Sequence, residues 1–433
     1  MRNPLLLLAL VLLATACSDE NTKSAAGPVP PDPCHEPLAT SYPAAALPTM
    51  HIDTEDAQPV ESKDEYLEAD FSVSDAAGNV LHEGEAEIRG RGNWTWTLEK
   101  KPYRIKLESS TALLGMPANR HWVLLANHAD RSLLRNAVTF ELSRQLGMAW
   151  TPRAQSVHVE LNGEYLGVYE LTEHVRIGSH RVNIPELKVG NTSPDTVSGG
   201  YLIEVDDLRG EDFCIDSEHD NNMVFCLVSP ETLLDPAWTV QRAWIEDYIR
   251  NTENAIYGEQ FADPVNGYAA WLDVDSAVDY YLVQEITKNI DGILQRSTFL
   301  HKPRDGRLVF GPVWDFDLAL GNMGMLDFND PEGWRSRYAS WYQRLFEDPV
   351  FAQKVHDRWI WLRDTGKLDA LRTYIDEHAG MLANAQAMNF ERWPVLDTDI
   401  GYSTGPGSYA CGIREMKSWL DTRIAWMDEA IAP

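Results

Sequence analysis

The stretch from Glu285 to Gly321, EITKNIDGILQRSTFLHKPRDGRLVFGPVWDFDLALG, constrains this chain more than any other. An apolar helical run ends just before Asp291-Gly292, and two strand-like runs then flank the hairpin signal Asp305-Gly306. The second run ends in Trp314-Asp315-Phe316-Asp317. A short hairpin of this kind brings two acidic clusters together. Paired carboxylates at its mouth suit a metal ion and a general base.

Length and charge narrow the classes of protein that this chain can belong to. Its 433 residues are enough for two or three domains, or for one large elaborated domain. The formal net charge is -29, and the acidic residues are spread along the chain. This charge argues against a nucleic-acid partner, because binding to a phosphate backbone needs a basic footprint. Strong acidity favours solubility and attracts cations.

The first residues have the pattern of an export signal. Arg2 precedes the apolar run Leu5–Leu13, which is too short to span a bilayer, and small residues lead to Cys17. We expect residues 1–17 to be a lipoprotein-type signal segment with Cys17 lipidated, which places the protein in the cell envelope on a lipid anchor, at the outer membrane, periplasm or cell surface. A simple signal peptide cleaved near Ala16 is the alternative. Residues 18–48 read as a flexible tether.

The other four cysteines allow three disulfide pairings in an oxidising compartment. Cys214 and Cys226 flank an acidic, Asn-rich loop, and we expect them to bridge it. Cys34 and Cys411 would then tie the start of the domain to its end. Free buried thiols are the alternative, and no cysteine or histidine spacing indicates zinc.

Secondary-structure signals change character along the chain. Asn162-Gly163 is the strongest hairpin signal, and Asp130 or Ser132 is the expected cap of a helix that stops at Gly147. Strands are expected at Tyr66–Val73, Ala86–Arg91, Tyr103–Leu107, His121–Leu125, Ser156–Leu161, Tyr165–Leu171 and Gly200–Asp206, and helices at Leu133–Leu146, Trp238–Tyr257, Val274–Lys288 and over most of 336–432.

These signals predict an α+β fold. One domain is expected over residues 49–433, with a β-rich lobe at about 49–235 and a mostly helical lobe at 236–433. The helical part contains Trp334, Trp341, Trp359, Trp361, Trp393, Trp419 and Trp426. Tryptophans spaced along helices are typical of a core, and carbohydrate stacking is the other interpretation.

The assembled motifs resemble the spore coat protein H (CotH) kinase family, in family order and over roughly residues 60–325. The resemblance implies a divergent protein-kinase-like fold. It also implies a secretory-type Ser/Thr kinase, as for spore-coat members, or a surface adhesin, as for fungal members. The motifs are RGRGNWTW (89–96), KKPYRIKL (100–107), LLRNAVTFELSRQLG (133–147), VHVELNGEYLGVYELTEHV (157–175), GGYLIEVDD (199–207), KNIDG (288–292) and GPVWDFDLALG (311–321).

The resemblance gives the acidic residues specific roles. Asp291, in the loop after a helix, matches the catalytic-loop Asp of kinases, which orients and deprotonates the acceptor hydroxyl. Asp315 matches the metal-binding Asp and would hold Mg²⁺ or Mn²⁺ against ATP phosphates. Asp317 would be a second ligand or an orienting group. The alternatives are an Asp-Gly turn for Asp291 and a cap or turn for Asp317.

Nucleotide contacts are expected in the first half of the chain. The turn with Gly90 and Gly92 precedes the strand that carries Arg104 and Lys106, which is the kinase order for phosphate binding. Lys106 and Arg104 share one face of the strand, since side chains alternate with a period of two. We prefer Lys106 as the phosphate contact, and Lys101 is a further candidate. A solvated strand face is the alternative.

Two glutamates match expected positions of the kinase pattern, and one metal-ligand position differs from it. Glu173 is expected near the hinge that holds adenine, and Glu141 as the partner that orients the lysine. The alternative is that both are surface carboxylates, which is the more common case for such residues. Kinases place a metal-binding Asn five residues after the catalytic Asp, where this chain has Arg296, with Ser297 beside it. Arg296 therefore puts the second metal site and full kinase activity in question.

The leading hypothesis is an exported atypical kinase. It would transfer the ATP γ-phosphoryl group to Ser or Thr of an exported protein, with Mg or Mn. One alternative is a surface interaction protein or pseudokinase that keeps the fold without transfer. A weaker alternative is a polysaccharide-acting enzyme that uses Asp291 and Asp315 as its two carboxylates.

Overall fold

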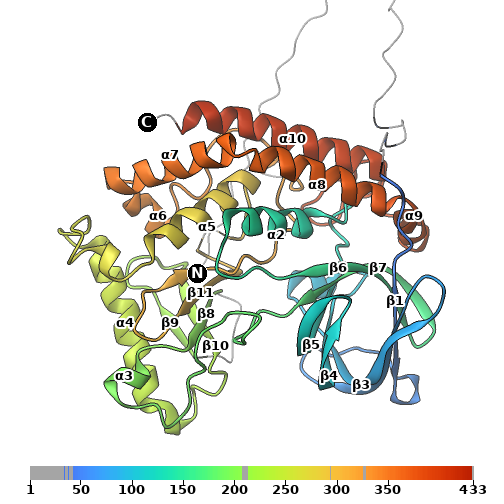
Figure 1. Cartoon of the computed structure of the whole chain (residues 1–433), viewed down its shortest axis with the longest axis horizontal. Coiled ribbons are helices and arrows are strands. Elements are labelled where there is room, and N and C mark those ends of the chain that lie inside the picture. Colours follow the sequence, from blue (N-terminus) through green and yellow to red (C-terminus); the bar gives the residue numbers. More distant parts are fainter. Residues whose placement is uncertain are drawn as a thin grey trace, which may run out of the picture.

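The computed structural model describes residues 34, 38, 42–206, 213–292, 294–324 and 328–431. The expected signal segment with Cys17 lies outside the described residues, as does most of the expected tether. Figure 1 shows three parts: a barrel, a second sheet, and a layer of helices that covers both. Among the described residues, no helix combines the length and apolarity needed to cross a membrane.

Seven strands in the first half of the chain form a closed barrel. The strand order is β1-β2-β3-β4-β5-β7-β6, and parallel pairing of β1 with β6 closes it. Inward-facing residues such as Phe71, Ile88 and Trp122 fill the barrel with a hydrophobic core of its own. The strands are β1 (Thr49–Thr54), β2 (Leu67–Ser74), β3 (Val80–Gly90), β4 (Tyr103–Leu113), β5 (Met116–Leu125), β6 (Ala154–Leu161) and β7 (Glu164–Glu173).

The β6–β7 hairpin confirms the strongest turn signal in the sequence. Asn162 and Gly163 have φ of 53° and 75°, the left-handed values of a type I′ turn. This turn matches the right-handed twist of the flanking strands. It therefore fixes the register that places alternate β7 residues inside the barrel.

A second, antiparallel sheet joins residues from both halves of the chain, in the order β12-β11-β8-β10-β9. Its central strand β8 is buried along its whole length. Cys214 on β9 lies opposite Cys226 on β10, and they form the expected disulfide. The strands are β8 (Tyr201–Val205), β9 (Cys214–Asp216), β10 (Val224–Ser229), β11 (Thr298–Lys302) and β12 (Val309–Phe310).

Helices α7, α8 and α10 lie over α2 and α5 in Figure 1 and share one large hydrophobic core with the second sheet. Trp341 and Trp359 are almost fully buried in it, which favours the core interpretation of the tryptophans. The helices are α1 (Trp94–Thr97), α2 (Arg135–Leu146), α3 (Pro194–Val197), α4 (Thr239–Tyr257), α5 (Val274–Thr287), α6 (Ser340–Leu345), α7 (Pro349–Asp364), α8 (Lys367–Met381), α9 (Ala383–Arg392) and α10 (Tyr409–Ala430); short 3-10 turns cover Glu55–Ala57, Pro236–Trp238 and Tyr268–Ala270.

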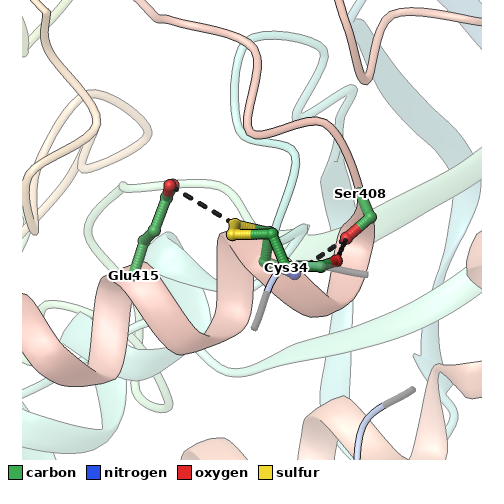
Figure 2. Close-up of a disulfide and its surroundings, with 4 residues drawn as sticks. Cys34, Ser408 and Glu415 are labelled. Carbon is green, nitrogen blue, oxygen red and sulfur yellow. Dashed lines mark hydrogen bonds between the residues drawn. A yellow bond between two sulfur atoms is a disulfide. The ribbon is translucent and has the colours of Figure 1, made fainter. Parts of the chain in front are cut away.

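A second disulfide joins Cys34 to Cys411 in the first turn of α10, as expected (Figure 2). Ser408 caps this helix, because its Oγ accepts from the Cys411 N–H at 3.0 Å. The same hydroxyl donates to the carbonyl of Cys34 at 2.7 Å. One serine therefore supports both the helix start and the chain attached to it.

The hairpin that carries the acidic motif differs from its sequence prediction. Its second strand, β12, ends at Phe310, so Asp315 does not end a strand and Asp317 does not continue one. Pro312 lies two residues further on and has no N–H with which to extend the ladder. Residues 311–317 instead form an irregular segment with Asp315 at a φ of 66°.

The fold class is α+β, with a β-rich N-terminal region and a helical C-terminal region. Two expected helices are present with slightly shifted ends. Helix α2 begins at Arg135, whose N–H donates to the Asp130 carboxylate at 2.9 Å, and Gly147 stops it with a φ of 73°. Helix α5 begins at Val274 as expected. Closure of the barrel is the feature that sequence patterns did not predict.

Candidate functional site

A cavity of about 360 Å³ lies where the barrel, the second sheet and the segment after β12 meet. We call it the acidic pocket. Its walls come from the β3–β4 connection, the residues after β5, the end of β8, the loop after α5 and the segment after β12. Its lining includes Arg91, Gly92, Lys100, Asn127, Asn136, Glu204, Asp206, Asp291, Arg296, Ser297, Trp314, Asp315 and Asp317.

The pocket brings Asp291, Asp315 and Asp317 together, as the hairpin argument requires. It adds Glu204 and Asp206 from the end of β8, to which the sequence reasoning gave no role. The only signal for these two was their place in the GGYLIEVDD motif. Five carboxyl groups therefore share one cavity, and a group of this density needs cations or protons to balance its charge.

Asn289 ties the two acidic segments to each other. Its Nδ2 donates to the Asp315 carbonyl at 3.3 Å, and its Oδ1 accepts from the Asp291 N–H at 3.4 Å. The Ser297 hydroxyl donates to Oδ2 of Asp315 at 3.2 Å. These contacts hold Asp315 in its left-handed conformation and aim its carboxylate at the cavity.

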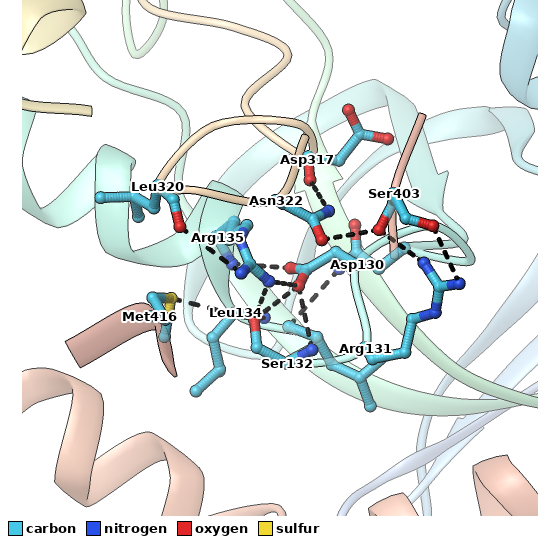
Figure 3. A network of polar contacts seen from close by, with 12 residues as sticks. Asp130, Arg131, Ser132, Leu134, Arg135, Asp317, Leu320, Asn322, Ser403 and Met416 are labelled. Carbon is cyan, nitrogen blue, oxygen red and sulfur yellow. Dashed lines mark hydrogen bonds and ion pairs between the residues drawn. The ribbon is translucent and has the colours of Figure 1, made fainter. Parts of the chain in front are cut away.

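The start of α2 holds the segment that carries Asp315 and Asp317. The Phe316 N–H donates to Oδ1 of Asn136 at 2.8 Å, between the two aspartates. Figure 3 shows the adjoining network, in which Arg135 pairs with Asp130. Nε of Arg135 also donates to the Ala319 carbonyl at 2.9 Å. Asn136 lines the pocket, and sequence reasoning missed it because an Asn inside a helix carries no local signal.

Burial and mutual repulsion raise the pKa values of two carboxyl groups in the pocket, those of Asp291 and Asp317. Burial, then the neighbouring Asp315 charge, raise the pKa of Asp291 to about 6. Burial, then Asp315 and Asp291, raise the pKa of Asp317 well above its ordinary value. Each shift reports a carboxylate that is costly to ionise alone, and a bound divalent cation would relieve that cost.

The arrangement suits an ion that is shared with a ligand. Within the described parts of the chain, the group with three ligand-type atoms within 4.8 Å of one another is Cys34, Cys411 and Glu415, whose sulfurs are in a disulfide. The pocket carboxylates are spaced more widely. Mg²⁺ keeps waters and typically binds through one or two carboxylates plus phosphate oxygens, so such a spacing fits it.

Arg91 is a half-buried cation that lines the pocket together with Lys100 and Arg296. Its guanidinium lies 5.3 Å from the ring centroid of Trp314, a cation–π contact. Burial lowers its pKa, and the charges of Asp315, Glu204 and Asp317 oppose that shift. Sequence order pointed to the glycines on either side of Arg91 and gave no role to Arg91 itself.

The structure leaves no room for a side chain at either glycine. Gly92 lines the pocket with a φ of +80°, and a Cβ there would lie 2.2 Å from Oγ1 of Thr95. A Cβ on Gly90 would lie 2.4 Å from the Trp96 ring. Both positions therefore allow the tight path that presents Arg91 to the cavity.

Lys106 and Arg104 are placed elsewhere on the barrel, and neither is among the described residues that line the pocket. Lys106 pairs with Glu87 on the neighbouring strand β3 and lies 5.6 Å from the Tyr66 ring centroid. The expectation that Glu141 orients this lysine is wrong, because Glu87 holds that position. Glu141 instead pairs with Arg144 one turn along α2, at 3.0 Å.

Glu173, the last residue of β7, is fully buried and paired with arginines. Its carboxylate accepts from Arg153 at 2.9 and 3.0 Å, and Arg181 lies 3.9 Å away. Glu173 does not line the pocket, so the structure does not bring it to the other expected site residues.

The two lysines before β4 donate hydrogen bonds to uncharged carbonyl and amide oxygens. Lys101 donates to the Trp96 carbonyl at 2.7 Å. Lys100 lines the pocket, but its Nζ donates to the Val168 carbonyl at 2.5 Å and to Oδ1 of Asn389 at 2.9 Å. Burial holds the pKa of Lys100 well below its ordinary value. Lys100 thus joins strand β7 to helix α9.

Arg296 lines the pocket, and its backbone N–H donates to the Asp291 carbonyl at 3.3 Å. Its charge lowers the pKa of Asp291, against the larger effect of burial. Where kinases have a neutral metal ligand, this pocket therefore has a cation that interacts with the expected base.

Fold and pocket together define an α+β protein whose acidic cavity suits a divalent cation and a phosphorylated ligand. The comparison with family models identifies the particular family: the CotH kinase protein model matches residues 88–427, and the chain belongs to this family. A search of curated proteins found no match for the chain. The family suggests a kinase-like function, which in general implies ATP and a divalent metal.

Proposed function

We propose that this protein is an exported atypical protein kinase that transfers the γ-phosphoryl group of ATP to Ser or Thr of another exported protein, with Mg²⁺ or Mn²⁺. The observation that carries the proposal is the meeting of Asp291, Asp315, Asp317 and Arg91 in one cavity. Membership of the CotH kinase family supports the reaction class.

Asp291 is the proposed base. The acceptor hydroxyl gives its proton to Asp291 while its oxygen attacks the γ-phosphorus, and the bond to the bridging oxygen of ADP breaks. With a pKa raised to about 6, Asp291 is largely ionised at neutral pH and is a better proton acceptor than an ordinary aspartate.

Asp315 and Asp317 are the proposed metal ligands. A divalent cation bound there would neutralise the charge on the phosphates. Ser297 and Asn289 orient Asp315, while Asn136 fixes the backbone between the two aspartates. These residues keep both carboxylates on the cavity before any ligand arrives.

A divergent kinase-like arrangement is part of the proposal. Along the chain come a glycine turn, the strand β4, the helix α2, the β6–β7 hairpin, then Asp291 and Asp315. This is the order of phosphate loop, strand, control helix, hinge, base and metal ligand in kinases. The closed barrel is the main departure.

Export is supported by the two disulfides, since such bonds persist in oxidising compartments. We propose a lipid anchor at Cys17 and a location in the cell envelope. An exported kinase would have to meet both its acceptor protein and its nucleotide outside the cytoplasm. ATP is scarce there, so the supply of nucleotide would limit the reaction.

Arg296 favours a second candidate, a kinase-fold interaction protein that binds nucleotide without transfer. Its charge beside Asp291 stabilises the ionised base and occupies the region of the second metal ligand. Arg296→Asn separates the two candidates. If the protein binds nucleotide without transfer because the arginine blocks the reaction, the variant should gain phosphorylation. If the protein is an active kinase in which the arginine aids phosphate binding, the variant should lose ATP affinity.

The test combines thermal shift with autophosphorylation. ATP with Mn²⁺ should raise the melting temperature of the wild-type protein, because a ligand that binds the native state stabilises it. Asp315→Asn should lose the metal-dependent part of that shift. Asp291→Asn should keep the shift and lose transfer by about 100-fold or more. Absence of any shift at millimolar ATP would refute the kinase proposal.

A matched pair of variants locates the phosphate contact. The pocket geometry favours Arg91, and the sequence order favours Lys106. Arg91→Met should weaken ATP binding by about tenfold or more, the value of a lost charge-assisted hydrogen bond. Lys106→Met, which leaves the pocket lining intact, should change it less than twofold. The reverse result would return the role to Lys106.

A further inference from the structure

A second cavity, of about 480 Å³, lies on the outer face of the barrel beneath α2 and α8. We call it the rear cavity. Apolar side chains such as Leu47, Met116, Leu134 and Met381 form much of its lining. Its volume is typical of small-molecule sites, which combine apolar walls with a few fixed polar groups.

The polar group that sets this cavity apart is Glu170 on β7. Its side chain is 4% exposed and lines the cavity. Oε2 accepts from Nδ2 of Asn127 at 3.3 Å, while Oε1 is buried and has no hydrogen-bond partner among the described residues. An unsatisfied buried carboxylate oxygen is costly, so it favours a ligand that donates hydrogen bonds.

A second residue of the lining, His378, also carries an acceptor. Nδ1 of His378 lies 2.9 Å from the Tyr374 carbonyl, which can only accept, so this nitrogen carries the proton. Burial lowers the pKa of His378, which keeps the ring neutral and leaves Nε2 as an acceptor. Two acceptors, one of them a carboxyl group, therefore line a cavity whose walls are part apolar and part polar.

The arginines at the cavity edge already have partners. Arg144 pairs with Glu141 at 3.0 Å, and Arg153 pairs with Glu173 at 2.9 Å. The charge of each arginine is therefore balanced by a glutamate. The acceptors and the overall charge of -29 both favour a cation.

We propose that the rear cavity is a binding site for a small amphipathic ammonium compound. Its ammonium group donates to Oε1 of Glu170, and its apolar part packs against Leu134 and Met116. The site is separate from the acidic pocket and does not depend on the proposed kinase function.

Calorimetric titration of the full chain at pH 8 with phenethylammonium chloride tests the proposal. Saturable one-site binding is expected, whereas 3-phenylpropionate, a similar body with the opposite charge, should not bind. Glu170→Gln should weaken binding of the ammonium compound by about 10- to 100-fold, the range for a charge-assisted hydrogen bond. Ala137→Phe should abolish it by filling the cavity, since Ala137 lies in the lining.

The matched control is Glu164→Gln, which removes the same charge from an exposed position on the same strand and should leave the affinity within twofold. Equal affinity in wild type and Glu170→Gln would overturn the proposal. Equal binding of the carboxylate compound, or no saturable binding of the ammonium compound to wild type, would also overturn it. Circular dichroism of each variant checks that it is folded.

Discussion

Glu285 shows how a single buried residue can organise this molecule. Its carboxylate pairs with Arg423 of α10 at 2.8 Å, and both side chains are 0% exposed. It also accepts the backbone N–H groups of Arg335, Ser336 and Arg337. Helix α5, helix α10 and the loop before α6 are therefore fastened at one carboxylate, directly before the loop that carries Asp291.

Removing one partner of this pair should be strongly destabilising. Glu285→Ala leaves the Arg423 guanidinium buried without its counter-charge, and we expect a loss of about 3–5 kcal/mol in the free energy of unfolding. Urea denaturation followed by fluorescence measures it. Arg392→Ala, which breaks an exposed pair with Glu164, is the control and should cost less than about 1 kcal/mol. Similar losses in both variants would contradict the role given to Glu285.

Glu170 should make stability depend on pH. Burial, then Asp130, raise its pKa to about 7, against the opposing effects of Asn127 and Arg144. The folded state then holds a proton that the unfolded chain releases near pH 4.5, so stability falls as pH rises from about 4.5 to about 7.

Glu170→Gln should remove this dependence. Above pH 7 the variant should be more stable than wild type by on the order of 2–3 kcal/mol. Below pH 4.5 the two should be alike. Melting temperatures measured from pH 4 to pH 9 would reveal the difference, and parallel curves would contradict the assignment to Glu170.

At the scale of residues, sequence reasoning found the acids and missed the groups that place them. Asp291 and Asp315 stand beside recognisable turn and strand signals. The pocket also contains Arg91, Asn136 and Glu204, which come from the barrel, helix α2 and the second sheet. Their role depends on how these three parts meet, which no local sequence pattern reveals. Lys106 has the expected strand position, but Glu87 lies directly opposite it on β3 and forms an ion pair with it.

At the scale of elements, helix α2 links the two cavities. Glu170 at the rear cavity accepts from Asn127, and Oδ1 of Asn127 accepts from Nδ2 of Asn136 at 3.3 Å. Oδ1 of Asn136 in turn accepts from the Phe316 N–H at 2.8 Å. A continuous polar path thus runs from β7 through α2 to the backbone between Asp315 and Asp317.

Asn136→Ala should disturb that backbone without unfolding the protein. Loss of one buried hydrogen-bond partner costs about 1–3 kcal/mol of stability. Under the proposed function, affinity for Mn²⁺ with ATP should fall by about tenfold. Titration with Mn²⁺ and ATP measures it, and Gln145→Ala on the same helix is the control. Unchanged affinity in Asn136→Ala would show that the aspartates are held by other contacts.

The predicted elements were those with local signals. The Asn162-Gly163 hairpin, α2 and α5 depend on nearby turn, cap and periodicity residues. Barrel closure depends on β1 pairing with β6, about a hundred residues later, which no local pattern encodes. The length of β12 was overestimated because its apolar run continues past Pro312, where the backbone can no longer pair.

At the scale of the whole molecule, the net charge of -29 should make stability depend on salt. Repulsion among the acidic groups opposes the compact state, and added ions screen it. The melting temperature should rise by a few degrees between 10 and 300 mM NaCl, limits chosen to span the fall in Debye length from about 30 to below 8 Å. An equal concentration of a neutral sugar osmolyte serves as the reference for non-ionic effects. A flat or falling salt curve would contradict the prediction.

The Cys34–Cys411 disulfide has a mechanical consequence. The chain is crosslinked to α10 at Cys34, and the Ala45 N–H donates to the Met381 carbonyl at the end of α8 before the first barrel strand begins. A pulling force applied to residues before Cys34 would therefore enter the helical layer through a covalent bond. The barrel strand β1 and the acidic pocket would carry none of that load directly, so tension on an anchor would leave the geometry of the pocket unstrained.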